Sequence, residues 1–366
     1  MGSFYVAGGG TGGHLYPGLA IADALASQRP DLDIRFIGAQ RGIERTVLPT
    51  TRWPHELLDL HPLYRSAPWQ NWKTLRGLAS ALGTIGRLAD AHPPVGVLGT
   101  GGYAAGALLG YARLKGIPYF LQEQNAVAGL TVRWFSPAAR ATFVGFPEAV
   151  ATLPPAARSR TVDTGNPIAP PPSPLPDRAV GRARWGFGDQ VTRVLLVFGG
   201  SQGSRAINDA IAAWLPAGLP AGWGAIWVTG PSEHPRLAHL ASERVRVVAY
   251  QNPMAQAYDT ADLAVARAGA MSTAELCAWG IPMVLVPLPT AAADHQSLNA
   301  RALAAAHAAQ VVPQSQLGQG ALGAALADVC SSGDTLSAMG TAARLRARVD
   351  AAHVIAARIL ASLNLQ

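Results

Sequence analysis

Short apolar runs recur along the chain, and stretches of helical character separate them. A strand inside a parallel sheet is covered by helices on both faces, so it reads as a continuous apolar run. The runs predict strands at residues 4–7, 33–38, 95–98, 118–121 and 141–144, then at 194–197, 225–228, 245–248, 263–266 and 282–286. This alternation predicts an α/β protein with doubly wound parallel sheets.

A proline-rich stretch interrupts the alternation between residues 153 and 177, with Pro170-Pro171-Pro172-Ser173-Pro174 at its centre. Such a composition favours extended, semi-rigid backbone. A chain of 366 residues also exceeds the usual size of one hydrophobic core. We therefore expect two doubly wound domains with a boundary in this stretch, and a closing helix or helix pair at residues 342–363.

Glycine clusters follow the first predicted strand of each half, at residues 8–13 (GGGTGG) and 199–203 (GGSQG). Glycine lets the backbone approach a ligand closely, and the amides that open the next helix attract anionic oxygens. The repetition predicts two phosphate-type loops at a cleft between similar domains, although a tight turn would need the same glycines.

The first cluster also matches a dinucleotide fingerprint through Gly8, Gly10 and Gly13. A nicotinamide site needs an acidic residue directly after the second strand to hold the ribose. Gly38-Ala39-Gln40 stand there instead. A dinucleotide-dependent oxidoreductase is therefore disfavoured and is kept only as an alternative.

Polar residues follow several predicted strands. His14 stands directly after the first cluster, where an imidazole suits a general base or a helix cap. Residues 122–125 (QEQN) occupy the sheet edge that presents ligand groups, although they would also suit a helix cap. In the second half, Glu275 suits two vicinal ribose hydroxyls or complements a helix dipole. Residues 294–299 suit hydroxyl recognition or a polar helix start.

Charge and composition narrow the class of partner. The net charge of +7 predicts an anionic partner, which is a phosphorylated substrate, an acidic lipid or nucleic acid. No motif supports nucleic acid. Cys277 and Cys330 lack metal-ligand spacing, so we expect no zinc site or disulfide framework and a reducing, cytoplasmic setting. No signal peptide is evident, and the uncharged stretch at 95–112 is too rich in glycine for a membrane span.

Several motifs resemble those of one enzyme family in order and spacing. They are GGGTGGHLYP at 8–17, GGY at 101–103, EQN at 123–125 with AGL at 128–130, GNP at 165–167, FGGSQGSR at 198–205 with Asn208, AGAMSTAE at 268–275, and Gln296 with Asn299. Together they resemble the MurG family, the UDP-N-acetylglucosamine transferases of glycosyltransferase family 28 that complete lipid II in peptidoglycan synthesis.

The resemblance implies a GT-B fold, in which two Rossmann-like domains face a cleft. It implies an acceptor domain at residues 1–163, rejoined by a C-terminal helix at 346–366, and a UDP-sugar domain at 164–345. The implied reaction is an inverting transfer of N-acetylglucosamine from UDP-GlcNAc to the C4 hydroxyl of the muramyl sugar of lipid I. The resemblance implies no cofactor and no obligatory metal, and it connects the chain to cell shape and division.

The resemblance also assigns candidate site residues. His14, as the base, and Glu123 match catalytic positions. Matching substrate contacts on the first domain are Thr11, Gly12, Gly13, Tyr103 and Asn125. Matching UDP-sugar contacts are Ser201, Gln251 through its backbone, Ala270, Met271, Ser272, Thr273, Ala274, Glu275, Gln296 and Asn299.

Two positions depart from the family pattern. Ala169 stands where an arginine is common, so a guanidinium contact to the donor cannot be assumed there. Gln122 replaces a familiar histidine before Glu123. Another UDP-sugar-dependent lipid glycosyltransferase, or a non-catalytic nucleotide-sugar binding protein, stays open as an alternative.

A lipid acceptor would explain an amphipathic segment at residues 69–88. Its apolar stripe consists of Trp72, Leu75, Leu78, Leu82, Ile85 and Leu88, and the neighbouring cations are Arg65, Lys73, Arg76 and Arg87. A basic amphipathic helix of this kind can lie on an anionic membrane surface. We therefore expect a peripheral protein at the cytoplasmic face of the cell membrane, although most amphipathic helices simply pack on their own domain.

Overall fold

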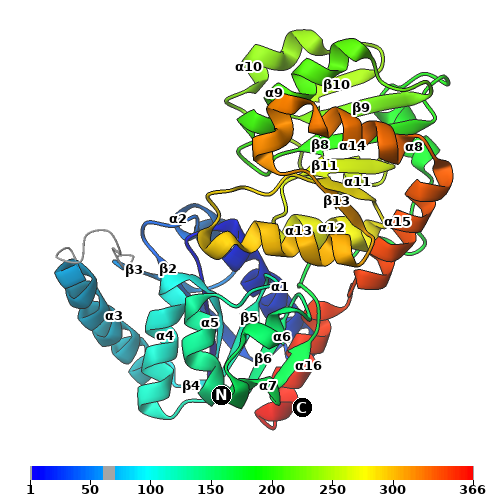
Figure 1. Ribbon diagram of the computed structural model, residues 1–366. Coiled ribbons are helices and arrows are strands. Elements are labelled where there is room, and N and C mark those ends of the chain that lie inside the picture. Colours follow the sequence, from blue (N-terminus) through cyan, green and yellow to red (C-terminus); the bar gives the residue numbers. More distant parts are fainter. Residues whose placement is uncertain (1, 61–70, 366) are drawn as a thin grey trace. The chain divides into compact units, whose positions relative to one another are not determined.

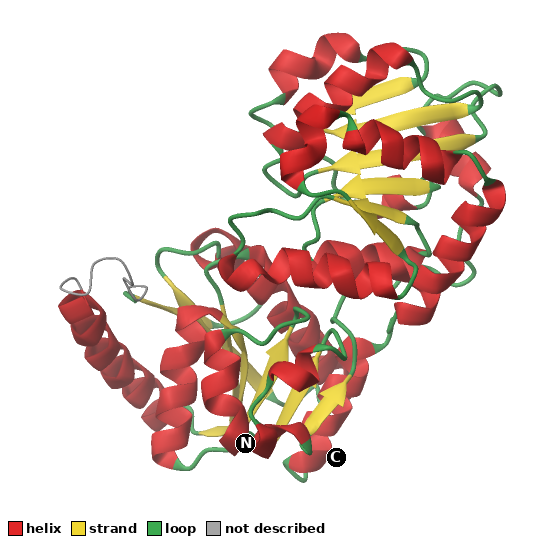
Figure 2. Ribbon diagram, in the orientation of Figure 1, coloured by secondary structure: helices red, strands yellow, loops and turns green. Residues whose placement is uncertain are grey.

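The computed structural model describes residues 2–60 and 71–365, without the side chains of residues 71–76. The chain forms two compact units, one made of Met1–Ile168 with Asp350–Gln366 and the other of Ala169–Val349. Each unit contains one parallel sheet with helices on its faces, as Figures 1 and 2 show. The α/β class and the two doubly wound sheets predicted from the apolar runs are therefore confirmed.

The sheet of the first unit has the strand order β3-β2-β1-β4-β5-β6-β7. Its strands are β1 (Ser3–Gly8), β2 (Asp33–Ala39), β3 (His55–Leu58), β4 (Pro94–Gly101), β5 (Tyr119–Glu123), β6 (Ala141–Val144) and β7 (Thr161–Asp163). Its helices are α1 (Gly12–Gln28), α2 (Glu44–Val47), η1 (Leu48–Thr50), α3 (Asn71–Ala91), α4 (Gly102–Lys115), α5 (Leu130–Phe135), η3 (Ser136–Ala138), α6 (Ala149–Thr152), α7 (Pro155–Arg158) and α16 (Ala351–Ser362). The strand order changes direction between β1 and β4, where open α/β sheets bind ligands.

The sheet of the second unit has the order β10-β9-β8-β11-β12-β13. Its strands are β8 (Arg193–Phe198), β9 (Trp223–Val228), β10 (Val245–Val248), β11 (Leu263–Ala266), β12 (Met283–Leu285) and β13 (Ala309–Val311). Its helices are α8 (Arg178–Arg184), α9 (Arg205–Trp214), η4 (Leu215–Ala217), α10 (His234–Leu237), η5 (Ala238–Leu240), α11 (Ala255–Tyr258), α12 (Ala270–Trp279), η6 (Ala292–Asp294), α13 (His295–Ala305), η7 (Gln314–Gln319), α14 (Ala321–Cys330) and α15 (Gly333–Arg346).

Strand β1 shows why the apolar runs are continuous. Phe4 and Val6 pack on the face covered by α1 and α16, whereas Tyr5 and Ala7 pack on the face covered by α3 and α4. Successive side chains of a strand point to opposite faces, so a strand that is buried on both faces needs apolar residues at every position. The last helix, α16, lies against α1 in this unit (Figure 1).

The sequence missed three strands, which are β3, β7 and β13. All three lie at an edge of a sheet and are partly exposed, so none reads as an apolar run. Strand β7 lies within the proline-rich stretch that was expected to be a linker. The predicted strand at 118–121 is also longer than expected, because β5 continues through Gln122 and Glu123.

The structure describes two segments that were considered for contact with a membrane, the uncharged stretch at 95–112 and part of the amphipathic segment at 69–88. The uncharged stretch at 95–112 forms β4 and α4, and no described helix is long and apolar enough to cross a membrane. In α3, Ile85 is buried, and Leu82 and Leu88 pack against the core, so this part of the predicted membrane stripe packs on its own domain. Leu78 is 37% exposed. Arg65 and the side chains of Trp72, Lys73, Leu75 and Arg76 lie outside the described residues.

Candidate active site

Three loops meet at the carboxyl edge of the first sheet, where the adjacent strands β1, β4 and β5 end. The loop after β1 touches the start of α4. A Cβ on Gly102 would lie 2.3 Å from the carbonyl oxygen of Gly9, and Gly102 has a φ of +80°. Only glycine fits such a close approach at a positive φ. This contact explains why a second glycine pair follows β4.

His14 is the third residue of α1, and its ring is held by the first glycine loop. Its Nδ1 lies 3.1 Å from the carbonyl oxygen of Gly9. A carbonyl only accepts hydrogen bonds, so this contact is a hydrogen bond when Nδ1 carries the proton, and the neutral ring then has its lone pair on Nε2. The hydroxyl of Thr11, 3.4 Å from the same Nδ1, can accept from it as well. The ring packs against Gly101, where a Cβ would lie 2.9 Å from Nε2. The role of His14 as a general base stays a prediction.

Glu123 is buried and fully engaged with its own loop. Its Oε1 accepts hydrogen bonds from the backbone N–H and the side-chain amide of Asn125, at 3.0 and 3.1 Å, and its Oε2 accepts one from the N–H of Gly129 at 2.8 Å. Both oxygens hold the loop that follows β5. This geometry favours a positioning role for Glu123 and Asn125 over the catalytic and substrate-binding roles predicted for them.

Hydrogen bonds between buried side-chain amides explain why the GNP motif at 165–167 contains Asn166. The Nε2 of Gln122 donates to Oδ1 of Asn166 at 3.1 Å, and Nδ2 of Asn166 donates to the carbonyl of Gln124 at 2.9 Å. Gln124 in turn donates to the carbonyl of Thr100 at 2.7 Å. Gln122 therefore has a structural partner, and its side chain does not reach solvent.

Sequence reasoning missed Glu44, which is fully buried beneath the first glycine loop. Its carboxylate accepts hydrogen bonds from the N–H of Gly10 at 3.0 Å and from the N–H of Ala39 at 3.2 Å. A dinucleotide site places its acid directly after the second strand, whereas Glu44 lies five residues beyond Ala39, the last residue of β2. Because the loop itself uses this carboxylate, Glu44 does not supply the missing ribose contact of a dinucleotide site.

The remaining candidates of the first unit lie around the same loop. Thr11 is the exposed N-cap residue of α1, and Gly12 and Gly13 form its first turn. Tyr103 opens α4, and its ring lies 3.5 Å from where a Cβ on Gly10 would be. Burial and the negative charge of Glu44 raise the pKa of Tyr103. The structure thus brings these four residues and His14 to one sheet edge.

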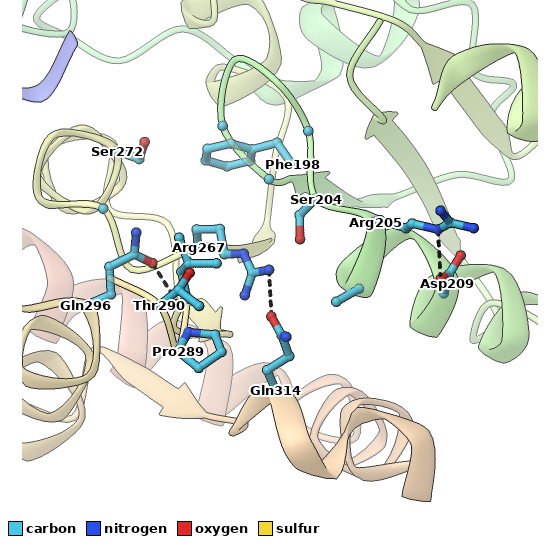
Figure 3. A pocket seen from close by; sticks show the side chains of 16 residues that line it. Phe198, Ser204, Arg205, Asp209, Arg267, Ser272, Pro289, Thr290, Gln296 and Gln314 are labelled. Carbon is cyan, nitrogen blue, oxygen red and sulfur yellow. Dashed lines mark hydrogen bonds and ion pairs between the residues drawn. The ribbon is translucent and has the colours of Figure 1, made fainter. Parts of the chain in front are cut away.

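The second unit contains an open pocket of about 650 Å³ at the carboxyl edge of its sheet. Figure 3 shows that its walls come from the ends of β8 and β11, the loop after β12, and helices α9, α12 and α13. Of the predicted UDP-sugar contacts, Ser272 and Gln296 line it. The amide of Gln296 is anchored, because its Oε1 accepts from the N–H of Leu288 at 3.0 Å.

Arg267 is a cation in the wall of this pocket that the sequence did not single out as a ligand. Its guanidinium donates to the carbonyls of Val286 and Pro287 at 3.1 and 3.2 Å. It also donates to the side chain of Gln314 at 2.8 Å, as Figure 3 shows. Within the described part of the chain, no carboxylate forms an ion pair with it. Burial lowers the pKa of Arg267. A partly buried cation without an acidic partner suits an anionic ligand.

Glu275 lies on α12, one turn beyond the pocket wall. Its Oε2 accepts a hydrogen bond from the hydroxyl of Tyr258 at 2.7 Å, and burial raises the pKa of Glu275. The ring of Tyr258 also contacts Phe198, which lines the pocket. A carboxylate that is positioned by a buried phenol suits hydroxyl recognition.

Several predicted UDP-sugar contacts do not line the pocket: Ser201, Gln251, Ala270, Met271, Thr273, Ala274 and Asn299. Thr273 and Asn299 are fully buried. The hydroxyl of Thr273 bonds to the carbonyl of Gly269 at 3.0 Å, and Nδ2 of Asn299 donates to the carbonyl of Ala268 at 3.1 Å. Both side chains hold the turn that opens α12, which favours a structural role for them; their contact with substrate stays a prediction. In the described part of the chain, no three His, Cys, Asp or Glu side chains gather as metal ligands would.

Comparison with known proteins identifies the family. The N-terminal domain of glycosyltransferase family 28 matches residues 4–144, and its C-terminal domain matches residues 194–355. Proteins named UDP-N-acetylglucosamine--N-acetylmuramyl-(pentapeptide) pyrophosphoryl-undecaprenol N-acetylglucosamine transferase are similar over almost their whole length. The one from Salinibacter ruber is 41% identical over 97% of this chain and 95% of its own, and the one from Moorella thermoacetica is 37% identical over 98% of each.

Solved structures agree with this comparison. MurG of Acinetobacter baumannii has a TM-score of 0.76 and 27% identity, and the match covers 98% of this chain and 99% of the other. The UDP-GlcNAc 2-epimerase of Neisseria meningitidis has a TM-score of 0.65 and 13% identity over 99% of this chain and 100% of the other, and it shares the fold alone. The chain therefore has the predicted GT-B fold and belongs to glycosyltransferase family 28, within the MurG family of transferases.

Proposed function

We propose that the chain transfers N-acetylglucosamine from UDP-GlcNAc to the C4 hydroxyl of the muramyl sugar of lipid I, which gives lipid II. The names of its relatives support this reaction. The observation that carries the mechanism is the orientation of His14, whose Nδ1 donates to the carbonyl of Gly9 and whose Nε2 is left to accept a proton. The fold alone does not select the reaction, because an epimerase shares it.

On the acceptor side of the displacement, the C4 hydroxyl attacks the anomeric carbon of the donor sugar. A carbon–oxygen bond forms there while the bond from the same carbon to the UDP oxygen breaks, so the anomeric configuration inverts. The hydroxyl proton moves to Nε2 of His14. Thr11, Gly12, Gly13 and Tyr103 surround this position and are proposed to hold the acceptor.

On the donor side of the same displacement, negative charge develops on the departing UDP and must be stabilised. Arg267 and the first turn of α12, including Ser272, supply a cation and helix-end amides at the pocket. We propose that Arg267 compensates for the arginine that Ala169 replaces. Gln296 is proposed to contact the sugar and Glu275 the ribose, and Ser201, Gln251, Ala270, Met271 and Ala274 remain proposed contacts around them.

The test is incubation with labelled UDP-GlcNAc and a lipid I analogue, followed by separation of the labelled lipid product. We expect product with UDP-GlcNAc, and much less with UDP-glucose or UDP-galactose. His14→Ala should lower kcat by about 10²- to 10⁴-fold and leave UDP affinity unchanged. Folded protein that binds UDP but forms no product from the correct acceptor would refute the assignment.

We further propose that the chain works as a peripheral protein at the cytoplasmic membrane surface, where a lipid acceptor would lie. The net charge of +7 supports attraction to anionic lipid. Trp134 on α5 is 60% exposed and lies in the same unit as the acceptor site. Co-sedimentation with anionic vesicles should fall when Lys73, Arg76 and Arg87 are replaced by glutamate. Unchanged binding would contradict the role of α3.

A further inference from the structure

One peptide group of the first glycine loop connects a buried carboxylate to the imidazole of His14. The peptide between Gly9 and Gly10 donates its N–H to Oε2 of Glu44 at 3.0 Å. The carbonyl of the same peptide accepts from Nδ1 of His14 at 3.1 Å. A trans peptide is planar and its N–H and C=O point in opposite directions, so one rigid group carries both hydrogen bonds.

Backbone atoms surround the carboxylate of Glu44. A Cβ on Gly9 would lie 1.6 Å from Oε1 of Glu44, and a Cβ on Gly42 would lie 1.9 Å from Oε2. The N–H of Ala39 donates to Oε1 at 3.2 Å. Among the described residues no Lys, Arg or His forms an ion pair with Glu44, which is fully buried. Its negative charge therefore acts mainly on the peptide groups that surround it.

We propose that Glu44 is a positioning residue that sets the catalytic base through the Gly9–Gly10 peptide. The carboxylate polarises the peptide N–H, which makes the carbonyl of Gly9 a stronger acceptor for Nδ1–H. The neutral imidazole is thereby held as the Nδ1–H tautomer, with its lone pair on Nε2, the atom proposed to take the proton of the acceptor hydroxyl. This inference rests on the proposed role of His14 as base.

During the reaction Glu44 takes no proton. The hydroxyl proton moves to Nε2, the Nδ1 proton stays in its bond to the carbonyl of Gly9, and the resulting imidazolium is stabilised by the polarised peptide. A carboxylate that contacts an imidazole directly orients a base in the same way. Here a peptide group of the glycine loop stands between the carboxylate of Glu44 and the ring of His14.

The principal variant is Glu44→Gln, which removes the charge and directs an NH₂ group at one of the two backbone donors. We expect kcat for transfer to lipid I to fall by about 10- to 100-fold, less than the full contribution of a general base. KM for UDP-GlcNAc should stay within about twofold, because Glu44 lies in the first unit and the donor pocket in the second. Nitrogen-15 spectra of the ring should change from the Nδ1–H tautomer to a mixture.

A double-mutant cycle separates this role from a merely structural one. If Glu44 acts through His14, Glu44→Gln should cause no further loss in the His14→Ala background. Thr100→Val is the matched control, because the buried Thr100 hydroxyl donates to the carbonyl of His14 at 2.7 Å and makes no bond to the Gly9–Gly10 peptide. Any loss from Thr100→Val should multiply with that of His14→Ala and leave the tautomer unchanged.

Three results would overturn the proposal: wild-type kcat and tautomer in Glu44→Gln, losses from Glu44→Gln and His14→Ala that multiply, or an Nε2–H ring in the wild-type protein. The last measurement decides even if Glu44→Gln does not fold. Failure of the proposed function is a different result, because the wild-type protein would then bind UDP and form no lipid product.

Discussion

Replacing Glu275 by glutamine should make the protein more stable at neutral pH and weaken its binding of UDP. The carboxylate of Glu275 accepts a hydrogen bond from the hydroxyl of Tyr258 at 2.7 Å, and burial raises the pKa of Glu275. Glutamine has almost the same shape and keeps an oxygen for that hydroxyl. The substitution therefore removes the buried charge and leaves the contact with Tyr258 in place.

The sign of the stability effect follows from the pKa of Glu275. A carboxyl whose pKa is higher in the folded protein contributes stability below its unfolded pKa of about 4.3. This contribution is lost as pH rises through the folded value. At pH 7 the ionised Glu275 therefore destabilises the fold, and Glu275→Gln should raise the midpoint of thermal unfolding. The difference between variant and wild type should shrink as the pH falls toward 4.3.

The magnitude of the binding effect follows from hydrogen bonding to the ribose. A hydrogen bond to a charged group is worth about 1.5–3 kcal/mol, so loss of one such bond weakens the affinity for UDP by about 10- to 150-fold. Calorimetric titration with UDP measures the affinity, and scanning calorimetry at pH 5 and pH 7 measures the unfolding midpoint. Glu243→Gln is the control, because Glu243 is exposed in the same unit, and neither quantity should change.

A lower unfolding midpoint of Glu275→Gln at pH 7 would refute the stability prediction, since the charge would then be stabilising. The binding prediction fails if UDP affinity stays within about twofold of the wild-type value, which would mean that no charged hydrogen bond to the ribose is lost. The two results are independent, because the first concerns burial of Glu275 and the second concerns its proposed ligand.

Three further predictions follow from named contacts. Gly102→Ala should destabilise the protein by about 1–3 kcal/mol in thermal unfolding, because Gly102 has a φ of +80° and faces the backbone of Gly9. Gly106 lies in the same helix, and a Cβ there meets nothing within 4 Å, so Gly106→Ala should instead stabilise the protein. Arg267→Gln should weaken UDP binding by about 10-fold or more in titration, and less strongly at high salt; unchanged binding would exclude a diphosphate contact. Burial raises the pKa of the Cys277 and Cys330 thiols to about 12 and about 11, so thiol reagents should label both slowly at pH 8 until the protein unfolds.

The buried strands were predictable because burial on both faces of a sheet requires a continuous run of apolar residues. Strand β1 must be apolar at every position, since Phe4 and Val6 face one helix layer and Tyr5 and Ala7 face the other. The edge strands β3, β7 and β13 were not predictable in this way. Each pairs with one neighbour only and is partly exposed, so its residues need not be apolar.

The same distinction between local sequence pattern and tertiary contacts applies to the candidate site. The glycine loops and His14 could be singled out because they directly follow the first strand of each half, and Glu275 because it lies one turn into a helix within a family motif. The family resemblance was confirmed by the comparisons. The hydrogen bonds by which Glu123, Thr273 and Asn299 hold their loops were not evident from spacing, because each depends on which backbone donors or acceptors lie around the side chain.

The sequence by itself determined the buried strands and their alternation with helices, the positions of the two glycine loops and the family to which the chain belongs. These properties depend on local periodicity and on residue types at fixed spacing. Only the tertiary structure decided that Glu44 and His14 share one peptide group, and that Arg267 lines a pocket with no acidic partner among the residues described. The physical reason is that hydrogen bonding and burial depend on atoms that folding brings together from distant parts of the chain.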